Sequence, residues 1–186
     1  MEDLEDLKNY RWEMRPLNKW DEVYISTLYK NWDQPQEISN LLQFPDLIPQ
    51  PLRFKFIHKG LTDAHQPYYH LAAINGLNSP EALNLTPRQE RKLKKLLFAH
   101  IGKDEDIRAV AATQTLFSYI SKTDSEEILR RMIHPNPTVQ HNLFSMLVSF
   151  YGIEGVGTFL VKNQHKYGKA TFVGKGLYCQ FFEKME

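Results

Sequence analysis

Seven histidines are the first side chains in this sequence whose chemistry could build a metal site. Three of them, His58, His65 and His70, lie close to Asp63 in the chain. His65 and His70 are five residues apart on either side of Pro67, whereas two zinc ligands on one helical face stand four apart. Asp63 is equally suited to cap the helix after this turn. The spacing therefore predicts structural or surface histidines, and we expect no metal and no cofactor.

The nucleophiles in the chain do not form a recognisable catalytic pattern. Cys179 is the single cysteine, which excludes an intrachain disulfide and a multi-cysteine zinc site. It lies among aromatic and aliphatic residues, so we expect a packed thiol whose burial suppresses the reactive thiolate; pairing with His141 or His165 is the alternative. No serine lies in a G-x-S-x-G sequence, and the glycines at 152, 155 and 157 lack the dinucleotide-binding spacing. No pair of carboxylates stands out as acid and base, and the sequence favours a protein without catalytic activity.

Positive charge is concentrated in one expected helix. The net charge of the chain is +1, but residues 1–50 carry −5 and residues 51–100 carry +5. The basic side chains opposite the leucines of that helix are Arg88, Arg91, Lys92, Lys94 and Lys95. Such a run is a solvated helix face, or a contact for an acidic protein or for phosphates. The near-zero total argues against a dedicated nucleic-acid binder, because such domains are strongly basic.

Composition favours a globular protein of one domain. The chain has 186 residues, of which 42% are hydrophobic, and this is enough to bury a core. No apolar run approaches the roughly 20 residues that a membrane helix needs. The acidic start, MEDLEDLKNY, differs from the basic and then apolar start of a signal peptide. We therefore expect a cytoplasmic protein with no membrane contact.

Apolar residues at three- and four-residue spacing predict helices along most of the chain. The expected helices cover residues 17–28, 36–43, 52–61, 68–77, 87–101, 107–120, 125–133, 139–151, 153–163 and 169–185, and the proline-rich segment 44–51 is a connector. Thr86 and Gln89 have the spacing of a capping box, and Asp124 is expected to cap its helix with Glu127. Helix 107–120 is apolar nearly all round, so we expect it to be buried between neighbours. A β-hairpin over 170–178 is the alternative to the last helix.

Helix pairs recur between residues 52 and 152. Ile107 and Val139 open equivalent helices 32 residues apart, and the pairs Ala72-Ala73 and Ala111-Ala112 are 39 residues apart. Fixed-period helix–turn–helix units are typical of α-solenoids, in which alanine lets neighbouring helices pack closely. The segments GKDEDIRAVAA (102–112) and HPNPTVQ (134–140) resemble the HEAT-repeat family, where a turn with Asp or Pro leads into Val-Arg and small residues. The sequence departs from that pattern at Gln140, which replaces the arginine, and at Tyr68-Tyr69.

This resemblance implies an all-α, HEAT-like α-solenoid of about four to five stacked helix pairs. Residues 1–186 would form a single helical-repeat domain, in which 1–51 are an N-terminal cap and connector, 52–152 the repeats, and 153–186 a C-terminal cap. Second helices line the concave side of HEAT-like stacks. The starts of these helices therefore predict partner-binding residues, which are Tyr69, His70, Arg108, Gln140 and His141. The alternative is that Tyr69 and His70 cover the adjacent helix pair.

The fold itself implies no activity, so function must be argued from surfaces. We expect a non-catalytic module that binds another protein through the surface of the stack, and a homodimer is one form of such binding. The alternative is a nucleic-acid-binding protein that resembles the HEAT-like DNA-repair glycosylases and uses the basic middle segment. An enzyme acting on a small molecule would need a deep pocket with converging polar groups, which the sequence does not display.

Overall fold

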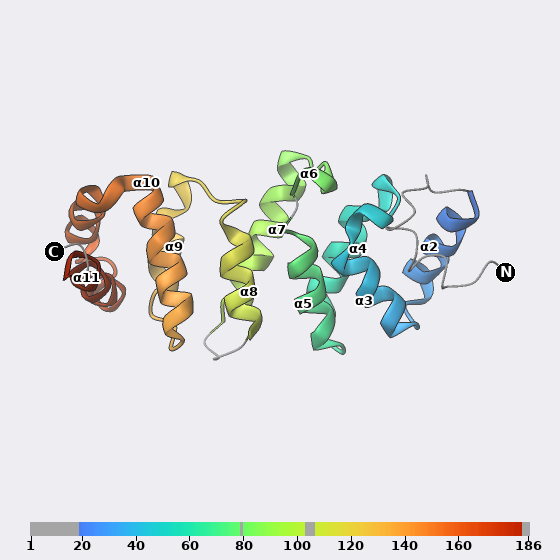
Figure 1. The fold of residues 1–186 in the computed structure, drawn as a ribbon, viewed down its shortest axis with the longest axis horizontal. Helices are drawn as coiled ribbons and strands as arrows, with labels where there is room; N and C mark the ends of the chain where they lie inside the picture. The colour runs from blue at the N-terminus through green and yellow to red at the C-terminus, as the bar shows by residue number, and fades with distance from the viewer. Residues whose placement is uncertain (1–18, 79, 103–106, 184–186) are drawn as a thin grey trace. The chain divides into compact units, whose positions relative to one another are not determined.

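The computed structural model describes residues 19–78, 80–102 and 107–183, and over these residues the protein is all-α, with no strand (Figure 1). The predicted fold class is therefore confirmed at this level. Residues 170–178 lie inside a helix, which excludes the β-hairpin alternative. The expected acidic N-terminal segment and the turn at 103–106 lie outside the described residues. Contacts within the chain divide it between Leu93 and Lys94 into two compact units, unit 1 and unit 2.

Unit 1 is built from short helices, several of which begin at proline. They are α2 (Lys19–Asn31), α3 (Pro35–Gln43), the 3₁₀ turn η1 (Pro45–Leu47), α4 (Gln50–Thr62), α5 (Pro67–Gly76), α6 (Pro80–Leu83) and the first half of α7 (Pro87–His100). Proline suits the first helical turn, where its missing N–H leaves no bond unmade. Helix α5 packs against both α3 and α4. Their facing side chains, among them Ile38, Phe56 and Ile74, are fully buried.

Two glycines allow a close approach of helices around Leu42. A Cβ built on Gly76, the last residue of α5, would overlap with the backbone carbonyl oxygen of Leu42 in α3. A Cβ built on Gly60 in α4 would come within 2.6 Å of Leu42 Cδ2. Since Leu42 itself is fully buried, there is no room to displace it. The absence of side chains at 60 and 76 therefore sets the spacing of α3, α4 and α5.

Unit 2 is organised around one long helix. After the second half of α7 come α8 (Ile107–Leu116), the 3₁₀ turn η2 (Lys122–Asp124), α9 (Ser125–Arg131), α10 (Pro137–Asn163) and α11 (Gly168–Glu183). Helix α10 packs against α8, α9 and α11, and α9 also packs against α11. The buried core of unit 2 includes Ile128, Leu129, Leu143, Phe144 and Leu147.

Helix α10 is broken in the middle at Gly152. The backbone of this residue has φ 68° and ψ 170°, a conformation that is not helical and that is essentially restricted to glycine. Figure 1 shows the chain turning sharply between the two halves. By length and composition α10 is, in the part of the chain that is described, the one helix that could cross a membrane. The break divides it into residues 137–151 and 153–163, each shorter than the roughly 20 residues of a membrane span.

The predicted capping box before α7 is confirmed. The Gln89 backbone N–H donates to Thr86 Oγ1 at 3.3 Å, and the Thr86 backbone N–H donates to Gln89 Oε1 at 2.9 Å. The predicted cap by Asp124 is wrong, because its side chain makes no capping bond to α9. Asp124 instead accepts from the Ser121 backbone N–H at 2.9 Å, which closes η2.

The expectation that helix 107–120 is buried between neighbours holds for part of its length and is wrong at Ile107 and Phe117. Helix α8 ends at Leu116, and the side chains of Ile107 and Phe117 are 69% and 43% exposed. The middle and end of α8 are buried at Ala109, Ala112, Thr113, Thr115 and Leu116, where α8 packs on α10. An apolar composition therefore did not produce burial at Ile107 and Phe117.

Candidate functional site

The aromatic and histidine residues predicted to bind a partner in unit 1 belong to its packing. Tyr69 is 1% exposed, and its ring meets the rings of Trp32 and Tyr68 edge to face, with centroids 5.5 and 4.7 Å apart. Burial raises the pKa of the Tyr69 phenol. His70 Nε2 donates to the backbone carbonyl of Asp63 at 2.6 Å. The buried Tyr69 side chain is thus a core residue, which is the alternative that the sequence left open.

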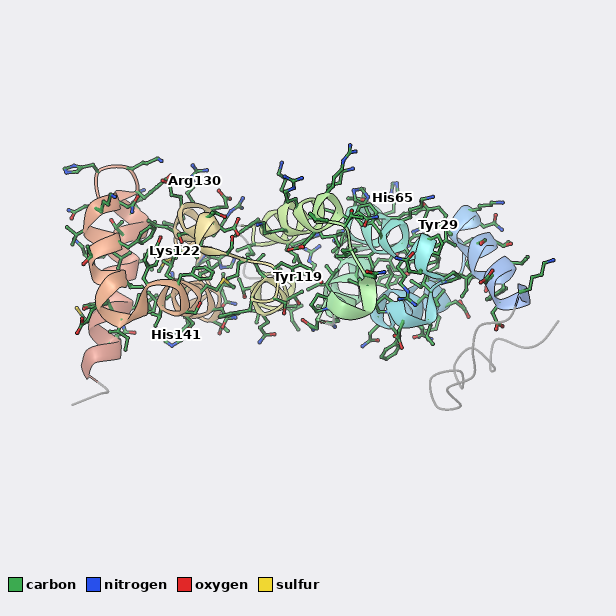
Figure 2. The ribbon with its side chains drawn as sticks, turned by 90° about the horizontal axis from the view of Figure 1, so that it is seen from above. Tyr29, His65, Tyr119, Lys122, Arg130 and His141 are labelled. Carbon is green, nitrogen blue, oxygen red and sulfur yellow. The ribbon has the colours of Figure 1, made fainter. Side chains whose placement is uncertain are left out.

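The three predicted residues in unit 2 have different surroundings. Gln140 is half-buried, and its Nε2 donates to the backbone carbonyl of His134 at 2.6 Å, which holds the turn before α10. Arg108 is half-buried, and His141 is exposed. Figure 2 shows His141 on the opposite side of unit 2 from Arg130. His141 is therefore the residue of this group that is most accessible to a partner.

The predicted basic residues are mostly solvent-exposed. Arg88, Arg91, Lys92 and Lys95 are exposed, while Leu93 and Leu97 on the other side of α7 are fully buried. Lys94 differs from its neighbours because its Nζ donates to Asp124 Oδ2 at 2.8 Å, and both side chains are less than one-fifth exposed. We call the four exposed residues the basic face of α7.

Asp63 acts as a helix cap. Its Oδ1 accepts from the backbone N–H groups of His65 and Gln66 at 2.8 and 2.9 Å, just before α5. Burial alone would raise its pKa, but the hydrogen bonds from His65, Trp32 and Gln66 together hold the pKa of Asp63 below its ordinary value. Among the described residues no group of three or more histidines, cysteines or carboxylates has the geometry to hold a metal ion.

Lys59 in unit 1 lies among aromatic rings, and its ammonium group is held by a hydrogen bond and by aromatic faces. Lys59 Nζ donates to the backbone carbonyl of Tyr29 at 2.8 Å and lies 4.3 Å from the ring centroid of Trp32. Burial lowers the pKa of Lys59, and the nearby Asp63 carboxylate opposes this effect. Because the ammonium is held by a carbonyl and by aromatic faces, it fastens α4 to the end of α2.

The expectation of a buried, packed thiol at Cys179 is wrong, because this residue is exposed. The buried side of α11 carries Ala170, Thr171 and Gly174, and Cys179 lies on a different face of the helix. Its aromatic neighbours in sequence therefore did not predict its surroundings.

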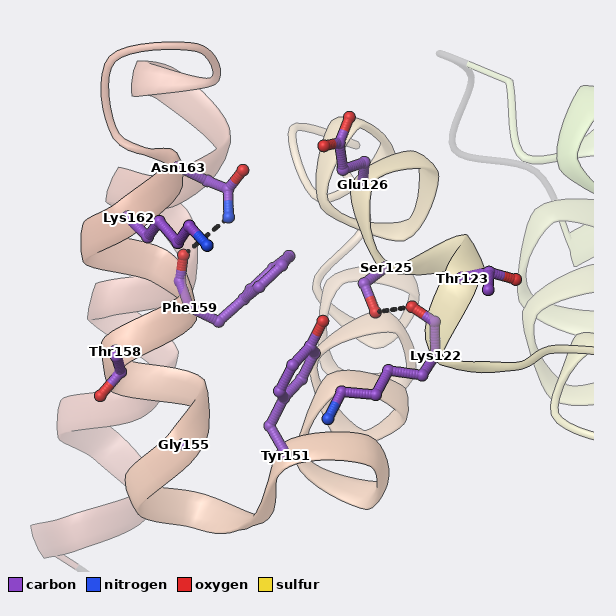
Figure 3. A pocket seen from close by; sticks show the side chains of 10 residues that line it. All are labelled: Lys122, Thr123, Ser125, Glu126, Tyr151, Gly155, Thr158, Phe159, Lys162 and Asn163. Carbon is purple, nitrogen blue, oxygen red and sulfur yellow. Dashed lines mark hydrogen bonds between the residues drawn. The ribbon is translucent and has the colours of Figure 1, made fainter.

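A cavity of about 680 Å³ lies in unit 2 between η2, the start of α9 and the second half of α10 (Figure 3). We call it the unit 2 cavity. The residues that line it are Lys122, Thr123, Ser125, Glu126, Tyr151, Gly155, Thr158, Phe159, Lys162 and Asn163. Its volume is in the range typical of ligand-binding sites, about 300–1,000 Å³.

Two stacked aromatic rings form the apolar wall of the unit 2 cavity. The ring centroids of Tyr151 and Phe159 are 4.7 Å apart, and the planes differ by 23°. Tyr151 ends the first half of α10, and Phe159 belongs to the second half. The break at Gly152 turns the second half back, and this turn brings the two rings together. Figure 3 shows the Phe159 ring projecting from α10 into the cavity.

Two lysines give the unit 2 cavity a positive character. Lys122 Nζ lies 4.5 Å from the ring centroid of Tyr151, and Lys162 is exposed. No carboxylate of the described residues forms an ion pair with either lysine. Glu126, which also lines the cavity, accepts from Lys166 Nζ at 2.6 Å and from the Tyr167 hydroxyl at 2.8 Å. These hydrogen bonds, that of Lys166 above all, hold the pKa of Glu126 below its ordinary value.

Two polar side chains of the unit 2 cavity are bonded to the backbone. Ser125 Oγ donates to the backbone carbonyl of Lys122 at 2.7 Å, and Asn163 Nδ2 donates to that of Phe159 at 2.9 Å. No histidine or cysteine is among the lining residues, so none of the lining hydroxyls has an imidazole base.

Sequence reasoning missed the unit 2 cavity. Its aromatic residues have helical spacing typical of core positions, and its lysines are isolated in sequence. The glycine after Tyr151 was the one available signal, because a glycine inside an apolar helical pattern marks a place where the helix can break.

No family model matches this sequence, and no curated protein or solved structure is significantly similar to it.

Proposed function

We propose that this protein is a non-catalytic helical-repeat module, with helix pairs stacked in a HEAT-like manner, that binds a segment of a partner protein in the unit 2 cavity. The packing of α4 on α5 and of α9 on α10 supports the helix-pair arrangement. The alanines at 72, 73 and 112 are buried, as close packing between neighbouring helices requires. The expected cytoplasmic location belongs to the same proposal.

The observation that carries this proposal is the stacked pair Tyr151 and Phe159 at an accessible cavity. Aromatic side chains are the usual anchors of protein interfaces, because they provide a large contact area at a low cost in conformational entropy. The cavity holds a few side chains of a partner, and the lysines at its edge supply polar contacts. The lining residues offer no nucleophile with a base, which favours binding over catalysis.

Photo-crosslinking from single positions tests this proposal. A photoreactive amino acid replaces Thr158, which lines the cavity and is exposed. Matched positions are Lys169 on α11, which is exposed and does not line the cavity, and His141, one of the partner-binding residues predicted from the sequence. Each protein is irradiated in an extract of the source cells, and the adducts are compared with those of the same protein carrying Phe159→Ala.

The proposal expects one protein adduct at position 158, absent at position 169, and reduced at least fivefold by Phe159→Ala. An adduct at position 141 alone would move the binding surface to the predicted partner-binding residues at the helix starts and would overturn the proposal. Equal adducts at all positions, or none at 158, would also overturn it. An adduct with a second copy of this chain identifies a homodimer, which light scattering then measures.

The basic face of α7 supports nucleic-acid binding as a second candidate function. Four exposed cations on one helix are the kind of surface that contacts phosphates. A gel-shift titration with a duplex and a single strand, at about 50 and about 200 mM salt, tests it, because binding through several phosphates falls steeply with salt. This function is favoured over the first if Arg91→Glu abolishes nucleic-acid binding and Lys162→Glu leaves it unchanged.

A further inference from the structure

Four lysines of unit 2 lie at the cavity or pair with carboxylates of the elements around it, and they differ in their partners. Lys94 pairs with Asp124 at 2.8 Å, and Lys166 pairs with Glu126 at 2.6 Å; neither of these lysines lines the cavity. The two lysines that line the cavity, Lys122 and Lys162, have no carboxylate partner among the described residues. The two cavity lysines are therefore among the positive charges of unit 2 that no carboxylate of the described residues neutralises.

The acidic residue of the cavity does not cancel this charge. The Glu126 carboxylate is engaged by Lys166 and by the Tyr167 hydroxyl, and Tyr167 is further bonded to Arg130 at 3.2 Å. Figure 3 shows the Glu126 side chain directed away from Lys122 and Tyr151. A ligand that enters the cavity consequently meets the two ammonium groups without a competing carboxylate at its centre.

The aromatic wall fixes one of these cations in place. The Lys122 ammonium lies over the Tyr151 ring, which is itself held by stacking on Phe159. A side chain ordered before binding loses less conformational entropy when its ligand arrives. On the other side of the stack, Phe159 offers an apolar surface within the same cavity.

Resting on the proposed function, we infer that the partner segment is acidic, with one carboxylate side chain near Lys122, another near Lys162, and an aromatic side chain packed on Phe159. Charge complementarity selects the carboxylates, and the stacked rings select the aromatic side chain. Two lysines in one cavity suit a few peptide residues. A nucleic acid would draw its affinity from more phosphate contacts along a longer surface.

The probe for this inference is a fluorescein-labelled octapeptide of alternating Glu and Phe, and its binding is measured by fluorescence anisotropy. Its matched probes have Gln or Lys in place of Glu. The protein variants are Lys122→Glu, Lys162→Glu and the matched control Lys169→Glu, an exposed lysine that does not line the cavity. Circular dichroism of each variant checks that the helical content is kept.

The inference expects the Glu peptide to bind about tenfold more tightly than the Gln peptide, the Lys peptide to bind least, and the difference to decrease at high salt. Lys162→Glu and Lys122→Glu should each weaken binding of the Glu peptide about tenfold, while Lys169→Glu leaves it within twofold. Equal binding of the Glu and Gln peptides, or an equal loss with Lys169→Glu, would overturn the inference. So would an eight-nucleotide single strand that displaces the Glu peptide at lower concentration.

The same charge reversals in the crosslinking experiment separate the two proposals. If the protein adduct at position 158 remains in Lys122→Glu and Lys162→Glu at its original yield, the partner segment is not acidic, and the proposed function stands. If position 158 gives no specific adduct, the proposed function fails and the inference fails with it.

Discussion

The indole Nε1–H of Trp32 donates to Asp63 Oδ2 at 2.7 Å. This bond joins the end of α2 to the turn between α4 and α5. Trp32 and Asp63 are 31 residues apart in the chain. The same carboxylate caps α5 through its other oxygen. One aspartate thus ties together three segments of unit 1, and the aromatic ring that donates to it is in turn packed against Phe56 and Tyr69.

Trp32 has a backbone conformation that is unusual for its residue type, and this leads to a first prediction. Its φ is 57°, and its backbone N–H donates to the Leu28 carbonyl at 2.8 Å, so it ends α2 in the left-handed region. Trp32→Ala and Trp32→Gly both remove the ring and should both destabilise unit 1. The left-handed conformation costs a residue with a Cβ about 1–2 kcal/mol. Glycine avoids this cost but also raises the conformational entropy of the unfolded chain, which offsets part of the gain. Urea unfolding should therefore find the alanine variant up to about 1 kcal/mol less stable than the glycine variant. An alanine variant as stable as the glycine variant would show that this backbone position is not strained.

The second prediction concerns the acid side of the stability curve. The pKa of folded Asp63 lies below the 3.8 of an unfolded aspartate, so the unfolded chain binds more protons as this group titrates. Its stabilising effect is fully present above the unfolded pKa and is lost as the pH falls through the folded pKa. The difference in free energy of unfolding between the parent and Asp63→Asn should therefore be greatest near neutral pH and shrink below pH 4 or so.

A partial version of the same change provides the control. Trp32→Phe keeps an aromatic ring but removes the indole donor, which should raise the pKa of the Asp63 carboxyl toward its ordinary value. Its loss of stability with acid should begin at the same pH as in the parent, because the unfolded pKa sets the onset, but it should be smaller and end at a higher pH, as measured by urea unfolding between about pH 2 and 7. A difference between parent and Asp63→Asn that does not change with pH would contradict the assignment.

The third prediction tests the close approach around Leu42. Gly76→Ala places a Cβ against the backbone carbonyl of Leu42, and only a separation of α3 from α5 can relieve the overlap. We expect a loss of about 3 kcal/mol in the free energy of unfolding. Gly176→Ala in α11 is the matched control, because its Cβ would meet nothing within 4 Å. There alanine should be neutral or stabilise by up to about 1 kcal/mol, since it favours the helix. Equal effects at the two positions would show that α3 and α5 are not held at this spacing.

Local signals in the sequence predicted most of the helices, because those signals act over a few residues. The capping box of Thr86 and Gln89 depends only on its own turn and was confirmed. Asp124 has the same kind of signal, but tertiary structure places Lys94 beside it and Ser121 uses it to close η2, so the expected cap is absent.

The candidate site could not be predicted in the same way, because it depends on contacts between segments. Cys179 has apolar neighbours in sequence and Ile107 opens an apolar helix, yet their exposure is decided by which face of α11 or α8 packs on α10. Tyr151 and Phe159 are adjacent only because α10 is broken between them. The pairing of Lys166 with Glu126, 40 residues apart, leaves Lys122 and Lys162 as the lysines at the cavity, and no spacing rule encodes such a choice.

The last prediction concerns that break. Gly152 has φ 68° and ψ 170°, and a Cβ at this position would meet nothing within 4 Å. Any loss of stability in Gly152→Ala is therefore conformational, and we expect about 1–3 kcal/mol. Asparagine, which tolerates the left-handed helical region, should not rescue the loss, because ψ here lies far from that region. A helical backbone at residue 152 would also carry Phe159 away from Tyr151, so Gly152→Ala should bind the Glu-Phe octapeptide more weakly, at a temperature where the variant is folded. An alanine variant with parental stability and parental peptide binding would show that the two halves of α10 do not need this backbone conformation.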